Sequence, residues 1–265
     1  MDEMSGTLSR VRGRVRSADG TRIAYERRGE GVPVILVSGA LCTGETERPL
    51  ADLLAPRFSV VTYDRRGRGG SGDTGPYDVQ REIEDLEALI GEVGGSQAFV
   101  HGIGSGGALA LAGVVAGLPV DRLSVFEPPF SAEAGARETF TARRRRLAGL
   151  LERGQRGAAI DLFLAEAADV AEPVRGLPRL ESVAHTLAYD HAVLGDGTVP
   201  AARLGRIHAR VLVVDGGASP ARTRRAALAV STALPRGRHR TLTGQTHLVA
   251  PHVLAPVLED FFEEE

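Results

Sequence analysis

A glycine-rich turn at residues 102–107, Gly-Ile-Gly-Ser-Gly-Gly, is a segment whose residue types and spacing could do chemistry. It follows an apolar run and matches G-x-G-x-x-G, in which glycines let the backbone approach a pyrophosphate. Glu127 ends the next apolar run, where such a fold places the acid that binds ribose hydroxyls. However, several sheet-like segments precede the turn, and the strand–helix alternation stops after Glu127. Dinucleotide binding is therefore an alternative rather than the leading interpretation.

The same turn also aligns with G-x-S-x-G, the sharp strand-to-helix turn that lifts a nucleophile above a sheet. Gly102 and Gly106 occupy the two glycine positions, where a tight turn leaves no room for a Cβ atom. The middle position, which should carry the nucleophile, is Gly104. Ser105 follows it directly.

The residue types that the sequence lacks exclude several other chemistries. It has no Lys, Asn or Trp, so all 32 basic residues are Arg. A Schiff base, a P-loop lysine and an N-glycosylation acceptor are therefore excluded. Cys42 is the single cysteine, which rules out an intrachain disulfide, and no Cys/His spacing is typical of zinc. We expect neither a metal nor a cofactor.

The charge balance argues against a polyanionic partner. With 32 basic and 34 acidic residues the net charge is −2, which gives no basic field for nucleic acid or an anionic membrane. The first sixteen residues contain no apolar signal-peptide core, and no run approaches the roughly 18 apolar residues of a membrane span. We therefore expect a cytoplasmic protein with a small-molecule partner. The sequence leaves open whether two copies pair as a homodimer.

The elements that must position these residues alternate along the chain. An Asp-Gly turn at Gly20 predicts a hairpin of strands at residues 11–17 and 21–27. Short apolar runs at 34–37, 59–63, 98–100, 123–126 and 211–214 alternate with helical patterns, among them residues 47–54 and 78–93. This alternation predicts a parallel sheet covered on both faces. A further strand at 238–242 and a helix at 253–262 close the chain. Residues 131–200 show only amphipathic helical stretches, so residues 1–130 and 201–265 are predicted as one α/β core with a helical insertion.

Several segments resemble small bacterial α/β-hydrolases. Residues 63–73, Tyr-Asp-Arg-Arg-Gly-Arg-Gly-Gly-Ser-Gly-Asp, match a characteristic loop of that superfamily almost letter for letter. Residues 244–247, Gly-Gln-Thr-His, resemble the loop that carries its catalytic histidine, and residues 38–41, Ser-Gly-Ala-Leu, resemble its oxyanion-hole loop. Residues 125–130 and 215–220 look like the ends of two of its strands. The chain is identified as a member of this superfamily, which implies an α/β-hydrolase fold, a mostly parallel sheet with helices on both faces, and a helical cap at 131–200.

The departure from this family lies at Gly104, where hydrolysis through a covalent intermediate needs Ser, Asp or Cys. Ser105 lies one residue after the nucleophile position, and a one-residue shift in this turn rotates the side chain away from the direction that a nucleophile needs. We therefore favour its backbone N–H as an oxyanion donor together with that of Ala40. Ser105 as nucleophile, or as the helix N-cap, stays an alternative. Whether Gly104 is natural or an engineered replacement of serine is open.

The resemblance assigns the catalytic histidine to His247, and an imidazole can act as a base or an acid near neutral pH. It needs an orienting carboxylate, but the residue at one family position for that acid is Ser219. We favour Glu127, at the other family position, over Asp215, which we interpret as structural. We expect the substrate pocket to include Leu41, Cys42 and Ile103.

Other polar residues receive structural interpretations. Arg65 and Arg66 are expected to brace their loop together with Asp64 and Asp73. Asp190, in the insertion, is interpreted as a solvated helix residue or a substrate contact.

The functional hypothesis is an enzyme that keeps the pocket, the oxyanion hole and His247 but has abandoned acyl-enzyme chemistry. A lyase, a cyclase or a hydrolase that uses a His-activated water would fit. The arginine-only composition suggests a high-G+C bacterium and hence a secondary-metabolite substrate. The alternatives are a ligand-binding pseudo-hydrolase, a serine esterase that uses Ser105, and the dinucleotide-binding protein.

Overall fold

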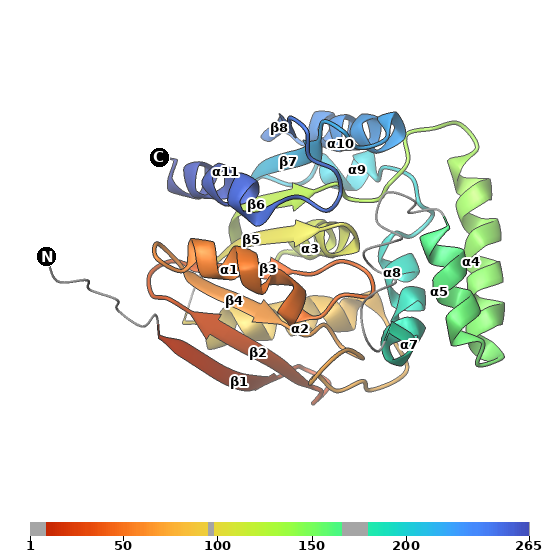
Figure 1. The fold of residues 1–265 in the computed structure, drawn as a ribbon, viewed down its shortest axis with the longest axis horizontal. Coiled ribbons are helices and arrows are strands. Elements are labelled where there is room, and N and C mark those ends of the chain that lie inside the picture. The colour runs from red at the N-terminus through yellow and green to blue at the C-terminus, as the bar shows by residue number, and fades with distance from the viewer. Residues whose placement is uncertain (1–8, 95–97, 166–179, 265) are drawn as a thin grey trace, which may run out of the picture.

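The computed structural model describes residues 9–94, 98–165 and 180–264, and these form an eight-stranded sheet flanked by helices (Figure 1). The strand order is β1-β2-β4-β3-β5-β6-β7-β8. β2 pairs antiparallel with β1 and β4, and all other neighbours are parallel. The strands are β1 (Arg10–Arg16), β2 (Arg22–Arg28), β3 (Pro33–Val37), β4 (Ser59–Tyr63), β5 (Ala98–Ile103), β6 (Val120–Phe126), β7 (Arg210–Gly216) and β8 (Gly237–Leu242). The predicted mostly parallel α/β-hydrolase sheet is confirmed.

The central strands are short runs rich in β-branched residues. Such residues favour extended backbone and pack well where helices cover both faces of the sheet. Val34 of β3 pairs with Val60 of β4 on one side and with Phe99 of β5 on the other. β5 and β7 extend beyond the predicted apolar runs, to Ile103 and Gly216. These extensions carry small and polar residues toward the carboxyl edge of the sheet, where ligands bind in folds of this kind.

Two apolar layers, one on each face of the sheet, hold the helices. α1 (Arg48–Leu54) and α11 (Pro251–Glu263) pack on one face. α2 (Val79–Glu92), α3 (Ser105–Ala116) and α10 (Ala221–Ala233) pack on the other. The helix predicted near residue 47 begins as a 3₁₀ turn, η1 (Gly44–Glu47), because Pro49 suits only the first turn of α1. This difference of a few residues places Glu47 just before the helix.

The insertion at residues 131–200 is helical where the structure describes it. It contains α4 (Ala136–Glu152), α5 (Arg156–Leu164), α7 (Leu180–Val183), η2 (Ala184–Thr186) and α8 (Leu187–Val193), and α9 (Ala201–Leu204) leads back to β7. The cap helices α4, α5 and α7 lie at the end of the molecule opposite the start of β1 and the end of α11 (Figure 1). The two ends of the insertion meet, since the Ser131 N–H donates to the Gly197 carbonyl at 2.8 Å.

Candidate active site

The turn between β5 and α3 has the geometry of a strained elbow. Gly104 adopts φ +56° and ψ −124°, a region that side chains rarely enter. Its N–H donates to the Phe126 carbonyl at 2.9 Å, which ties the elbow to the end of β6. A Cβ on Gly106 would lie 2.2 Å from the Val37 carbonyl oxygen, and one on Gly102 would lie 2.6 Å from the Gly107 Cα. These glycines are therefore explained by the packing of the turn itself.

The missing side chain at Gly104 leaves space directly beside His247. A Cβ built on Gly104 would lie 3.5 Å from both Cε1 and Nε2 of the imidazole, and the next nearest atom would be the Gly39 Cα at 4.0 Å. Gly104 thus occupies the position from which a nucleophile would face a histidine. The space in front of Nε2 is open to another group.

His247 is oriented by Glu127, as expected from the position of this acid after β6. Nδ1 of His247 lies 2.8 Å from Glu127 Oε2, and Glu127 Oε1 accepts the Gly216 N–H at 2.9 Å. Burial raises the pKa of Glu127, but the bonds from His247 and Gly216 outweigh it and hold this pKa below its ordinary value. Glu127 also adopts φ +45°, which costs roughly 1–3 kcal/mol for a residue with a side chain. The backbone of Glu127 is therefore strained at the residue whose carboxylate binds the imidazole.

The hydrogen bond at Nδ1 determines what the other ring nitrogen can do. When Nδ1–H donates to the carboxylate, Nε2 carries a lone pair and can accept a proton. Nε2 lies 3.5 Å from the position that a Cβ on Gly104 would occupy, as does Cε1. A proton taken up at Nε2 gives an imidazolium that Glu127 stabilises.

The proposed oxyanion donors are the N–H groups of Ala40 and Ser105. Within the described ranges, neither N–H donates a hydrogen bond to another group of the protein, so both can donate to a ligand. Leu41 follows Ala40 in a left-handed conformation with φ +61°, which shapes the turn. Arg68 supports the loop by donating to the Gly39 carbonyl at 2.6 Å and to the Cys42 carbonyl at 3.3 Å.

A cavity of about 520 Å³ connects these groups. Its walls include Ala40, Cys42, Ile103, Gly104, Ser105, Glu127 and His247. The prediction that Leu41 lines the pocket is wrong: Leu41 is not among the lining residues and packs instead with apolar cap residues such as Leu147 and Leu187. Its left-handed backbone turns the side chain toward the cap, whereas its neighbours face the cavity.

Comparison with known proteins gives the family. The model of the alpha/beta hydrolase family matches residues 34–258. The chain belongs to the α/β-hydrolase family. An alpha/beta hydrolase from Sphaerobacter thermophilus is similar over 94% of this chain and 100% of its own, with 48% identity and a TM-score of 0.85. An esterase from Thermogutta terrifontis has the same fold, with 20% identity, a TM-score of 0.77, and 95% and 98% of the two chains covered.

A sequence relative in Bacillus subtilis, the uncharacterized hydrolase YraK, is 33% identical over 95 residues. The match covers 35% of this α/β-hydrolase and 35% of that protein. The chain therefore spans about a third of the curated relative that it matches.

The Ser105 hydroxyl is bound away from the histidine of this α/β-hydrolase. It donates to Asp190 Oδ1 at 2.7 Å and accepts from Arg65 Nη1 at 3.2 Å. The idea that Ser105 is the N-cap of its helix is wrong, because Gly104 occupies that position and Ser105 is the first helical residue. A serine that donates to a carboxylate of lowered pKa has no strong base to activate it, so the geometry disfavours Ser105 as nucleophile.

A buried ionic network, here called the arginine cluster, lies next to Ser105. It consists of Arg65, Arg66, Arg68, Asp19, Glu82, Asp85 and Asp190. Arg65 bridges Glu82 and Asp190 at 2.8 Å each, and Arg68 also binds Asp190. Arg66 pairs with Asp85 at 2.7 Å and with Asp19 at 2.9 Å. The cluster therefore joins the loop after β4 to α2 and to the cap helix α8.

This network corrects two expectations. Arg65 and Arg66 do not pair with Asp64 and Asp73; Asp64 accepts the N–H groups of Gly44 and Gly70, and Asp73 binds two cap side chains. Asp190 is not solvated but is 2% exposed. Sequence reasoning missed Glu82 and Asp85, although both lie on the apolar side of α2. The available signal was the position of these two acidic residues among the apolar residues of the helix, which indicates burial.

A second histidine–carboxylate pair shows that contact alone does not make a site. Nε2 of His239 lies 2.8 Å from Asp215 Oδ2, as close as the His247–Glu127 pair. Neither residue lines the cavity, and β8 is an edge strand of the described sheet. This contact agrees with the structural role expected for Asp215.

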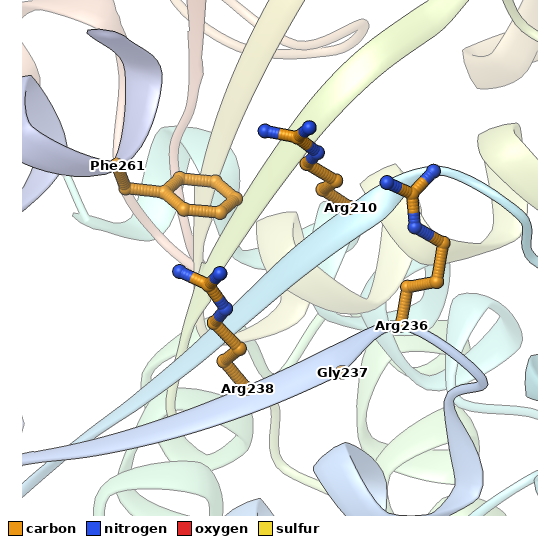
Figure 2. Close-up of a pocket in the computed structure, with 5 residues that line it drawn as sticks. All are labelled: Arg210, Arg236, Gly237, Arg238 and Phe261. Carbon is orange, nitrogen blue, oxygen red and sulfur yellow. The ribbon is translucent and has the colours of Figure 1, made fainter. Parts of the chain in front are cut away.

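A second hollow, of about 320 Å³, lies at the amino edge of β7 and β8, opposite the elbow. Figure 2 shows the guanidinium groups of Arg210, Arg236 and Arg238 around it, beside Phe261. Arg238 pairs with the Glu264 carboxylate, so the chain's own C-terminal segment supplies an anion here.

Two further observations concern the described residues of this α/β-hydrolase. They contain no group of three or more His, Cys, Asp or Glu side chains arranged to hold a metal ion. None of their helices combines the length and the apolar composition that a membrane crossing requires.

Proposed function

We propose that this protein is an enzyme that acts on a small organic molecule without forming a covalent intermediate. In this proposal His247 is the acid–base catalyst, Glu127 orients it, and the Ala40 and Ser105 N–H groups stabilise an oxyanion. One observation carries the proposal: Nε2 of His247, whose Nδ1 lies 2.8 Å from Glu127, is 3.5 Å from the side-chain position of Gly104 inside a cavity.

The chemistry follows from what the residues can hold. Nε2 takes a proton from a carbon acid next to a carbonyl group, or from a water molecule at the Gly104 position. Glu127 stabilises the imidazolium, and the two N–H groups receive the negative charge that develops on the carbonyl oxygen. A positioned base contributes about 10²–10⁴ in rate, and one oxyanion donor about 10²–10³.

The substrate class is a small carbonyl compound that fits about 520 Å³. Elimination, cyclisation and hydrolysis by an activated water use the same base and the same oxyanion hole. The names of the relatives, a hydrolase and an esterase, support the hydrolytic form. The use of arginine for every basic residue, which suggests a high-G+C bacterium, supports a secondary-metabolite substrate.

The test uses 5-nitrobenzisoxazole, whose isoxazole ring opens to a coloured cyanophenolate when a base removes the proton on C3 and the N–O bond breaks. We expect turnover by the wild-type protein and a loss of about 10²–10⁴ in kcat/KM for His247→Ala. His239→Ala is the matched control, because it removes an imidazole from a carboxylate pair outside the cavity. Equal turnover by His247→Ala and the wild type would refute the mechanism.

A fluorophosphonate probe separates this proposal from the serine-esterase alternative. We expect no covalent labelling, since Gly104 offers no nucleophile and the Ser105 hydroxyl is held by Asp190 and Arg65. A mass shift on the peptide that contains Ser105 would establish the esterase instead. Ligand binding without turnover of any carbonyl compound would indicate the pseudo-hydrolase.

A further inference from the structure

Glu47 is a buried carboxyl group in the wall of the same cavity. It ends the 3₁₀ turn η1, is 5% exposed, and lines the cavity together with Gly104 and His247. Within the residues that the structure describes, its carboxyl group has no recorded hydrogen bond or ion pair. Buried carboxylates are normally paired, because leaving water without a partner is costly. Glu47 therefore differs from the other buried acids of this protein.

The environment of Glu47 favours its neutral form. Burial raises the pKa of Glu47 to about 7, and the nearby His247 is the opposing influence. By contrast, the pKa of Glu82, which is buried to a similar extent, is lowered because Arg65 binds it. The difference follows from the presence or absence of a cationic partner.

The other charged or titratable groups around Glu47 do not neutralise it. On its own turn, Glu45 pairs with Arg48. The Cys42 thiol of the oxyanion loop has its pKa raised to about 11 by burial, so it is neutral. From the loop after β4, Asp64 accepts the Gly44 N–H and Arg68 donates to carbonyl groups of the oxyanion loop and to Asp190. From the loop after β8, His247 bonds Glu127.

We propose that Glu47 is the proton donor of this site, acting on the substrate from the cavity wall while His247 acts as the base. This inference rests on the proposed function. It assigns a second catalytic group and narrows the substrate class to molecules whose departing or rearranging oxygen must gain a proton. Two groups with opposite tasks in one cavity allow poor leaving groups to depart without a full negative charge.

The step balances within the site. His247 Nε2 takes the proton from carbon, the electron pair of the C–H bond forms the new π bond, and the bond to the departing oxygen breaks. The proton of Glu47 goes to that oxygen. After release, the imidazolium returns its proton through water to the Glu47 carboxylate, so no other reactant is consumed.

The first test measures the protonation of Glu47 directly. Carboxyl carbons of glutamate are labelled with ¹³C in the full-length protein, and the Glu47 resonance is assigned by its loss in Glu47→Gln. We expect this resonance to titrate near pH 7. A midpoint below about 5 would overturn the proposal, because the group would then be ionised at neutral pH.

The second test compares two benzisoxazoles that differ in the leaving ability of their phenolate oxygen. We expect Glu47→Gln to lower kcat/KM by at least about tenfold on unsubstituted benzisoxazole but by less than about threefold on the 5-nitro compound, since only the poorer leaving group needs the proton. The decline in the wild-type rate above pH 7 should also disappear. Glu45→Gln, on the exposed face of the same turn, is the matched control.

The outcomes separate the two proposals. Equal losses on both compounds, or no loss, with turnover that still depends on His247 would overturn the role of Glu47 and leave the proposed function intact. Turnover that is independent of His247, or no turnover of either compound by the wild type, would overturn both.

Discussion

The cavity wall at Glu47 and the arginine cluster differ in how they hold buried carboxyl groups. In the arginine cluster each guanidinium is bound by at least one carboxylate at 2.7–2.9 Å. In the cavity, Glu47 has no recorded cationic partner among the described residues. The cavity wall also has positive-φ backbone at Gly104 and Glu127.

This difference separates residues that stabilise the fold from residues to which we assign roles in the proposed reaction. Removing one partner of a buried ion pair strongly destabilises a protein, because the other charge is left buried without a counter-ion. Strained backbone and unpaired buried acids, by contrast, persist only where the surrounding structure enforces them. Substitutions in the arginine cluster should therefore reduce stability. Substitutions in the cavity should alter chemistry and, at Glu47 itself, increase stability.

The largest expected effect is at Asp190, which binds Arg65, Arg68 and Ser105. Asp190→Ala should lower the free energy of unfolding by about 3–5 kcal/mol, because two buried guanidinium groups lose a counter-ion. Urea denaturation at pH 7 measures this loss. Arg137→Ala, which removes the exposed partner of Asp196, is the control and should cost no more than about 1 kcal/mol. Equal losses would erase the contrast between a buried and an exposed ion pair.

The next effect depends on pH and lies in the cavity. The pKa of Glu47 is about 7 in the folded protein against 4.5 for an ordinary glutamate, so folding favours its protonated form. An acid whose pKa is raised on folding destabilises the protein progressively as the pH rises from about 4.5 through 7. Glu47→Gln should remove this loss, and its stability gain over the wild type should be roughly 2 kcal/mol larger at pH 8 than at pH 5. A gain that is independent of pH would mean that Glu47 is ionised in the folded state.

A smaller effect is expected at the elbow. Gly104→Ser should cost about 1–3 kcal/mol of stability, because serine must adopt φ +56°. It should also gain fluorophosphonate labelling, since its Cβ has ordinary contacts and lies beside His247. Gly91→Ser, where a Cβ meets nothing within 4 Å, is the control for stability. A folded Gly104→Ser variant without labelling would show that the elbow does not present a side chain to His247.

The smallest effect concerns Ser105. Ser105→Ala removes the hydrogen bond to Asp190 and the longer one from Arg65, but Asp190 keeps its ion pairs with both arginines. We therefore expect a loss of about 1–2 kcal/mol in the free energy of unfolding, measured with urea. A loss as large as that of Asp190→Ala would mean that the hydroxyl, rather than the arginines, holds the cap helix α8.

The sequence alone determined most of the fold, because hydrophobic periodicity reports which faces are buried. The strand at Ser59–Tyr63 agrees with its apolar run to the residue, and α2 lies within one residue of its predicted range. Motifs also located Gly104, His247 and Glu127, since an elbow and its facing loops need particular residues at particular places. Leu41 was misplaced because one backbone angle decides which way its side chain turns.

Only the tertiary structure decided which carboxylates are paired. In the sequence, Glu47 is one of several acids near the start of a helix, and Asp190 is one polar residue of a cap helix. Glu47 and His247 are 200 positions apart in the chain but line one cavity and interact electrostatically, and Asp190 binds Arg65 across 125 positions. The pKa of a carboxyl group depends on burial and on neighbours that are distant in sequence, so the local sequence pattern does not predict it. Packing therefore made one acid a structural anion and left the other able to hold a proton.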